Sequence, residues 1–389
     1  MKWLALVLIM FADPVRAELY NSANNPNNFN RISGMNLVSK FDLLPSKGSL
    51  SDKRMGWSES YWPSNKGGIA YRWNHPDPMP FKYRLHTREE VQKMGRKELE
   101  QLSPAELYDI ANDDFTYTLT KTSLQKYSPR DLWWEGICHG WAQAAAHYPE
   151  PAPVLVKNRS GMTVPFGASD VKALLAMHEA YNYGGKFGFV GVRCKASGKV
   201  EGEGDERDAN PNPPAPEIAD APDCKDVNAG AFHVVITNML GILGKGFVAD
   251  IDRFGDVWNQ PITGYKMSVV GEEAVSAEHQ AAGISRRVKV EMVMEYGEEL
   301  KFWTRELEAA GNRNFVSKLP VIGTPAQKNL TKKYSYVVEL NQSGNVIGGE
   351  WLSATRPDFL WMFERAKAFK NSPVPLANLK NIYRPIKLK

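Results

Sequence analysis

Cys138 is the residue of this 389-residue chain that is best placed to act as a nucleophile. It lies in the stretch WWEGICHGWAQAAAHYPEP (residues 133–151), where an alanine-rich run follows it. The run predicts a thin helix that begins near Cys138 and ends by Tyr148, because the residue before a proline is disfavoured in a helix. A helix N-terminus lowers the pKa of a thiol. A small buried structural cysteine would fit the same position, and position alone does not separate the two.

A thiol nucleophile also needs a base, and His233 is the best candidate among the seven histidines. The surrounding segment AFHVVITNML is apolar and β-branched, which predicts a strand that would hold the ring rigidly. His139 is next to Cys138, but adjacent residues on a helix point in different directions. His178 falls on the apolar face of a second predicted helix and is interpreted as a core residue. A histidine in a strand is also a common structural residue.

The group that would orient the imidazole comes from the segment FVADIDRF, which predicts the next strand. If the two strands form a hairpin, Asp250 and Asp252 lie near His233 and share one strand face, since side chains two residues apart point the same way. A cysteine on a helix, a histidine and a carboxylate is the order of thiol acyl-transfer sites. Asp250 is the preferred orienting acid and Asp252 the alternative.

The N-terminal residues MKWLALVLIMFADPVRA predict a signal peptide over residues 1–17, with an apolar core too short to span a membrane. Export to an oxidising compartment favours disulfides, and the chain has three cysteines. Cys194 and Cys224 flank an irregular stretch rich in glycine, proline and acids. A disulfide between them would contribute about 3 to 4 kcal/mol and would leave Cys138 unpaired.

Charge and composition exclude one class of function. Lysine and arginine number 48 against 44 acids, and the basic residues do not cluster. A nucleic-acid partner is therefore not expected. After removal of the signal peptide, no membrane association is expected either.

The order of predicted elements indicates an α+β protein. Residues 18–65 predict a loosely ordered segment, and residues 18–125 as a whole a helical N-terminal region that serves as a lid or pro-segment. Thr87 and Ser103 predict N-caps of short helices, and Ser169 the N-cap of a longer one. The catalytic core is expected over 126–275. Residues 276–389 predict a β-rich part of the same core or a second subdomain, with a terminal helix near 357–370.

Two motifs are similar to a known family. VWNQPITGYK (residues 257–266) resembles the surface peptide through which plants perceive oomycete transglutaminase elicitors, and WEGICHGWA resembles the active-cysteine segment of that family. The similarity extends through VPFGASDVKALL, FHVVITNMLG, GFVADIDR and GGEWLSATRPDF, over roughly residues 133–361. The chain thus resembles the transglutaminase elicitor family, which has oomycete and bacterial members.

The resemblance implies a secreted protein-glutamine γ-glutamyltransferase with a papain- or transglutaminase-like core, in which the nucleophile at a helix N-terminus packs on an antiparallel sheet. Cys138 matches the nucleophile, His233 the base and Asp250 the orienting acid. It also implies calcium dependence, without a transferable ligand set, and no organic cofactor. The implied partners are proteins bearing glutamine and lysine, or small primary amines. Candidate oxyanion or cleft residues are Trp133, Trp134, Trp258 and Asn259.

Two alternatives stay open. The same thiol constellation would serve a papain-like cysteine protease or a glutamine deamidase, although His139 replaces the aromatic residue that follows the cysteine of papain-like proteases. A non-enzymatic secreted protein that binds a host surface through VWNQPITGYK is the second alternative.

Overall fold

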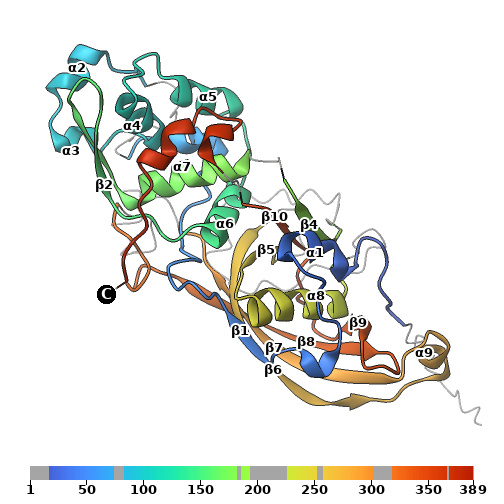
Figure 1. Cartoon of the computed structure of the whole chain (residues 1–389). Coiled ribbons are helices and arrows are strands. Elements are labelled where there is room, and N and C mark those ends of the chain that lie inside the picture. Colours follow the sequence, from blue (N-terminus) through green and yellow to red (C-terminus); the bar gives the residue numbers. More distant parts are fainter. Residues whose placement is uncertain are drawn as a thin grey trace, which may run out of the picture.

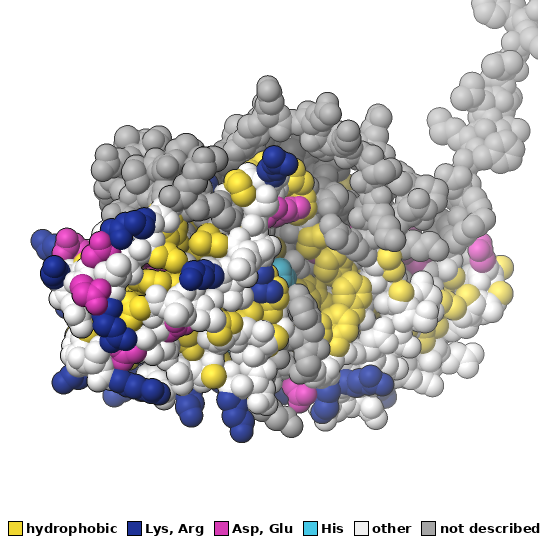
Figure 2. Space-filling view, turned by 90° about the horizontal axis from the view of Figure 1, so that it is seen from above, with side chains coloured by type: hydrophobic (Ala, Val, Ile, Leu, Met, Phe, Trp, Pro, Cys, Tyr) yellow, Lys and Arg dark blue, Asp and Glu magenta, His cyan; other side chains and the backbone are white. Residues whose placement is uncertain are grey.

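The computed structural model describes residues 17–73, 83–181, 185–192, 226–251, 257–300, 318–365 and 368–388. Helices gather in one half of the molecule and long antiparallel strands in the other (Figure 1). The C-terminal turns return to the helical half. The face shown in Figure 2 is hollowed between these halves, and hydrophobic side chains line much of the hollow. The mixed composition confirms an α+β fold.

Among the described residues, the helical half contains six α-helices, a small two-stranded sheet and short 3₁₀ helices. The 3₁₀ helices are η3 (Ser64–Lys66), η4 (Gly68–Ala70), η9 (Phe369–Asn371) and η10 (Ala377–Asn381). The α-helices are α2 (Arg88–Lys93), α3 (Arg96–Leu99), α4 (Pro104–Ala111), α5 (Thr118–Lys126), α6 (Cys138–His147) and α7 (Ala168–Ala180). The small sheet pairs β2 (Val154–Lys157) with β3 (Thr163–Phe166). Thr87 and Ser103 form capping boxes at α2 and α4, as their sequences predict. The cap of α7 is Gly167 rather than Ser169.

The other half is an eight-stranded sheet whose order is β4-β10-β5-β6-β7-β8-β9, with β1 also paired to β6. The strands are β1 (Lys47–Ser49), β4 (Phe187–Gly191), β5 (Phe247–Asp250), β6 (Asn259–Glu273), β7 (Arg286–Gly297), β8 (Asn329–Leu340), β9 (Val346–Trp351) and β10 (Phe359–Phe363). Short helices complete it: η1 (Pro26–Phe29), α1 (Asn30–Ser33), η2 (Phe41–Leu43), α8 (Ala229–Ile236), η8 (Thr237–Ile242) and α9 (Ala277–Ala281). Neighbouring strands of this sheet run antiparallel in the described part of the chain.

Two segments have a different secondary structure from the one that the sequence predicts. The segment that contains His233 is not a strand: it forms α8, followed by the π-helix η8. It therefore makes no hairpin with β5, which pairs with β6 and β10 instead. The expected helix near 357–370 contains the strand β10 instead, and its end overlaps the short 3₁₀ helix η9 (Phe369–Asn371). Short apolar runs buried on all sides carry no period that separates helix from strand, which explains both errors.

One local signal identifies α8. Asn228 caps this helix, and its Oδ1 accepts the backbone N–H groups of Gly230 and Ala231 at 3.0 and 3.2 Å. Gly230 also lets the helix approach β9, because a Cβ there would lie 2.1 Å from the Gly348 carbonyl oxygen. An asparagine before a small-residue turn is a helix start signal, and it outweighs the β-branched residues that follow.

The first residues described close the sheet, so they are not loosely ordered. The backbones of Glu18 and Tyr20 hydrogen-bond with β9, and the Ala23 carbonyl accepts the N–H of Gly191 at the end of β4. These strands are opposite edges of the sheet. Five extended residues span at most about 17 Å, so the sheet curls until its two edges nearly meet.

Residues 57–62 cross the helical half. Trp57 and Trp62 are fully buried in its core. The indole N–H of Trp57 donates to the Tyr148 carbonyl at 2.9 Å, and that of Trp141 donates to the Trp57 carbonyl at 3.1 Å. Beside them a buried Lys172 pairs with Glu150 at 2.7 Å and with Glu59 at 3.7 Å. Residues 57–62 are therefore part of the helical core.

Helix α6 contributes to both hydrophobic cores. Ala142 and Ala146 belong to the core of the sheet half, whereas Cys138, Trp141, Ala144 and Ala145 belong to that of the helical half. Small side chains allow close contact on both faces. The closest approach is at Gly140, where a Cβ would lie 2.2 Å from the Ala176 carbonyl oxygen of α7.

We predict that Gly140→Ala destabilises the protein by about 1 to 3 kcal/mol, because the added methyl group forces α6 away from α7. Denaturant unfolding measures the change. Gly185→Ala is the matched control, since its Cβ would meet nothing closer than 3.6 Å. Equal stability of the two variants would contradict the close packing of α6 on α7.

We also predict that a chain starting at residue 31 is less stable than one starting at residue 18. The deletion exposes two sheet edges and removes Phe29, which is fully buried. The loss of Phe29 alone corresponds to about 1.5 to 3 kcal/mol. Thermal unfolding and size-exclusion chromatography check this, with removal of residues 387–389 as the control. An unchanged unfolding midpoint would show that the segment does not hold the sheet closed.

Candidate functional site

Cys138 is the first residue of α6, as the sequence predicts. The N-cap position is Ile137, whose backbone N–H donates to the Tyr61 carbonyl at 2.7 Å. Gly136 permits this approach, because a Cβ there would lie 2.4 Å from the same oxygen. The turn before the helix is thus held by residues 61 and 62, and it leaves the thiol 9% exposed.

The thiol faces the start of β6. Its Sγ lies 3.6 Å from Nδ2 of Asn259 and 3.9 Å from the Val257 carbonyl oxygen. The other end of the Asn259 amide, Oδ1, accepts the indole N–H of Trp361 at 2.7 Å. Trp361 lies on β10, so helix α6 and strands β6 and β10 meet at this point.

Burial raises the pKa of the Cys138 thiol to about 11. The hydrogen bond from Asn259 acts in the opposite direction, whereas the charges of Glu299 and Asp250 raise the pKa further. The thiol is therefore protonated at neutral pH in this conformation. A nucleophilic role requires a change that stabilises the thiolate.

Asp250 ends β5 and pairs with Asn259 across the strands. Its carboxylate is fully buried, and Oδ1 accepts the backbone N–H of Trp258 at 3.1 Å. The structure thus brings Asp250 and Asn259 together with Cys138. The alternative acid, Asp252, lies outside the described residues.

His233 contacts a different set of residues from those that contact the thiol. It is fully buried in α8, where Nδ1 is 2.9 Å from the Tyr336 hydroxyl and the ring stacks on Phe41 with a centroid distance of 5.3 Å. Burial lowers the pKa of His233 to about 3, so the ring is neutral. The contacts described for His233 join it to Tyr336 and Phe41, and those described for the thiol join it to Asn259 and Val257.

His139 faces α7, in agreement with its expected direction. A hydrogen bond with the backbone of Ala180 raises the pKa of His139, while burial, the larger effect, lowers it. The ring is thus held by the end of α7.

Two tryptophans form an aromatic wall beside this site. Trp133 is 38% exposed, and its ring lies 6.4 Å from that of the half-buried Trp258. Tyr61 donates a hydrogen bond from its hydroxyl to the Trp133 carbonyl at 2.7 Å. Trp134 is half-buried. Trp258 directly follows Val257, so the wall stands next to the thiol.

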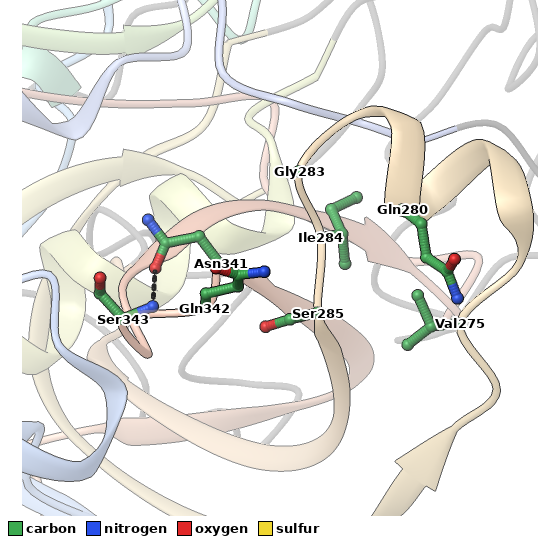
Figure 3. A pocket seen from close by; sticks show the side chains of 8 residues that line it. All are labelled: Val275, Gln280, Gly283, Ile284, Ser285, Asn341, Gln342 and Ser343. Carbon is green, nitrogen blue, oxygen red and sulfur yellow. Dashed lines mark hydrogen bonds between the residues drawn. The ribbon is translucent and has the colours of Figure 1, made fainter.

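A separate surface pocket of about 580 Å³ lies at the far end of the sheet (Figure 3). It is lined mainly by polar residues around α9 and the β8–β9 turn, such as Gln280, Asn341 and Gln342. It contains none of the residues that the sequence nominates for catalysis.

Several expectations concern features that the described residues do not test. No group of three or more His, Cys, Asp or Glu side chains among them is placed to hold a metal ion. Cys194, Cys224 and residues 1–16 lie outside the described ranges. Within those ranges, no helix is long and apolar enough to cross a membrane.

Two residues of the site were missed by sequence reasoning. Trp361 lies in a segment that predicts a helix, and Glu299 carries no recognisable motif. Neither has a local signal, because Trp361 meets Asn259 only through the fold of the sheet and Glu299 acts on the thiol through its charge.

Two comparisons with known proteins agree on the family and the fold of the chain. The family model described as transglutaminase elicitor matches residues 111–375. Among solved structures, the chain is similar to the GP42 transglutaminase from Phytophthora sojae, with a TM-score of 0.62 and 20% identity over 94% of this chain and 97% of that chain. At this identity the likeness shows the fold. No curated protein matches the chain.

We predict that Asp250→Asn makes Cys138 react faster with iodoacetamide at pH 8. Removing the carboxylate charge lowers the pKa of the thiol and increases the thiolate fraction, by about threefold for half a pKa unit. Asparagine keeps an oxygen for the Trp258 N–H. Peptide mass spectrometry of Cys138 measures the rate, with Glu278→Gln on the distant, exposed helix α9 as the control. A slower or unchanged rate would show that the Asp250 charge does not act on the thiol.

Proposed function

Because the chain belongs to the transglutaminase elicitor family, we propose that it is a secreted protein-glutamine γ-glutamyltransferase with Cys138 as the nucleophile. The observation that carries the proposal is the placement of the thiol on the first residue of α6, against the amide of Asn259. The placement fits a papain- or transglutaminase-like arrangement, in which a helix N-terminus supports a thiolate and the sheet supplies the opposite wall.

The proposed reaction has two steps. Sγ of Cys138 attacks the side-chain carboxamide carbon of a protein glutamine, the C–N bond breaks, and the amide nitrogen leaves as ammonia with the thiol proton. A lysine or other primary amine then attacks the thioester, and its nitrogen forms the new amide while the thiol recovers a proton. No metal or organic cofactor is needed to balance either step.

Two donors are available for the oxyanion of the tetrahedral intermediates. The backbone N–H of Cys138 belongs to the first turn of α6, where N–H groups have no acceptor within the helix. The second donor is Nδ2 of Asn259, which lies 3.6 Å from Sγ of Cys138. Removal of one such donor lowers kcat by about 100- to 1,000-fold in other acyl-transfer enzymes.

The base of the proposed mechanism is His233, with Asp250 as the acid that supports the site. In this structure, the charge of Asp250 raises the pKa of the thiol, so a supporting role would have to act through the base. The contacts described for the ring of His233 are with Tyr336 and Phe41, and none of them involves the thiol. His233 is therefore the residue of the triad that most needs a direct test.

The wall formed by Trp133 and Trp258 supports protein substrates. The exposed ring of Trp133 and the half-buried ring of Trp258 are suited to bind the apolar parts of a peptide and to exclude water from the thioester. Exclusion of water favours amine transfer over hydrolysis. A protease or deamidase would use the same thiol and differ in the acceptor that reaches it.

A non-enzymatic recognition protein is the second candidate. It is favoured by the thiol itself, which is 9% exposed and has its pKa raised to about 11. An activated nucleophile has the opposite shift. In this case the accessible part of the segment 257–266 would bind a partner without chemistry. That part is the exposed Lys266 and the half-buried Val257, Trp258 and Thr263, because the other residues of the segment are buried.

We predict that the protein incorporates a labelled primary amine into a glutamine-containing protein, and that Cys138→Ala lowers the rate by about 1,000-fold or more. Covalent label on the substrate is measured with calcium and with a chelator, since calcium dependence is part of the proposal. Gly185→Ala serves as the control for a harmless substitution. Retained incorporation in Cys138→Ala would exclude the thiol mechanism.

The same assay separates the alternatives. Ammonia release without incorporation identifies a deamidase, peptide cleavage a protease, and neither activity the recognition protein. His233→Asn is compared with Cys138→Ala in the same assay. Loss of the buried ring lowers the unfolding midpoint in either case, so kcat is measured well below that midpoint. If His233 is the base, kcat of the folded variant falls; an unchanged kcat would assign it to the core alone.

A further inference from the structure

Trp361 is a buried residue that the proposed mechanism does not use. It lies on β10, where it pairs with Val248 of β5 and Phe189 of β4, and it is 7% exposed. Its indole N–H donates to Oδ1 of Asn259 at 2.7 Å. Because the indole nitrogen is a donor only, the oxygen end of the Asn259 amide must face Trp361.

This constraint decides which end of Asn259 meets the thiol. An amide presents an oxygen at one end and an NH₂ group at the other, and rotation about its last bond exchanges them. Rotation here would place NH₂ against the indole N–H, so that two donors would face each other in a buried site. The cost of a buried donor without an acceptor is about 1 to 3 kcal/mol, so the NH₂ end stays on Sγ.

We propose that Trp361 is a positioning residue for Cys138, which acts through Asn259 by holding the Asn259 NH₂ group against the sulfur. A donor at this position stabilises the thiolate, since the hydrogen bond from Asn259 lowers the pKa of the thiol against the effect of burial. With the amide reversed, its oxygen would face the sulfur and disfavour the thiolate. The benefit to an oxyanion additionally rests on the proposed function.

The test uses the full-length protein and the alkylation rate of Cys138 by iodoacetamide as a function of pH. Trp361→Phe removes the N–H and keeps most of the ring. We expect its rate at pH 8 to fall about three- to tenfold, which corresponds to a rise of about 0.5 to 1 unit in the apparent pKa of the thiol. Asn259→Leu removes the amide and is expected to slow alkylation to a similar extent.

The double variant Trp361→Phe with Asn259→Leu distinguishes positioning from packing. If Trp361 acts through Asn259, the second substitution adds nothing to the first, and the two effects are non-additive. Additive effects, or an unchanged rate in Trp361→Phe, would overturn the proposal. The matched control is Trp351→Phe on β9, which should leave the rate unchanged. It also loses an indole hydrogen bond, which is half-buried and runs to the Val227 carbonyl at 2.7 Å.

Two further readouts protect the test. If Trp361→Phe does not fold, the indole N–H of Trp361 is followed by nitrogen-15 NMR in the Asn259→Leu variant. This substitution should shift the Trp361 signal and leave the Trp351 signal in place. An unmoved Trp361 signal would contradict the contact. In the amine-transfer assay, the kcat of Trp361→Phe should fall about tenfold with little change in KM. Absence of transfer in the unmodified protein would refute the proposed function, while the alkylation cycle would still decide the role of Trp361.

Discussion

The structure depends on the burial of α6 on two opposite faces. One face packs on the core of the sheet half and the other on that of the helical half. The alanines and Gly140 keep α6 close to its neighbours on both sides, while Trp141 fills the core of the helical half. Larger side chains would separate the halves, and the first turn of α6 would no longer reach β6. The position of Cys138 follows from this packing.

The same burial creates the chemical problem of the site. It fixes the thiol against Asn259 and beside Asp250, yet it also raises the pKa of the thiol. Burial of Cys138 therefore fixes its position and at the same time disfavours its thiolate form. The Asn259 amide, held in orientation by Trp361, offsets part of the cost of the thiolate. A bound substrate that changes the exposure of the thiol or the surroundings of Asp250 would offset more of it.

Local signals in the sequence predicted what depends on local structure. The start of α6 at Cys138, the capping boxes at Thr87 and Ser103, and the β-rich character of the residues after 276 follow from turn residues and periodicity. The family follows from the motifs around Cys138 and residues 257–266. His233 shows the limit of such reasoning: an apolar, β-branched run buried on all sides is compatible with a strand, and only the cap at Asn228 identifies the helix. Trp361 shows another limit, since its contact with Asn259 exists only because β10 and β6 both border β5.

The central claim is that Cys138 carries the acyl group during transfer from glutamine. The most direct measurement is the mass of the protein after brief mixing with a glutamine-containing peptide and acid quench, followed by peptide mapping. The account predicts an adduct of the peptide less ammonia on Cys138, which hydroxylamine removes as expected for a thioester. Amine incorporation with no adduct on Cys138, or with the adduct on another residue, would contradict it.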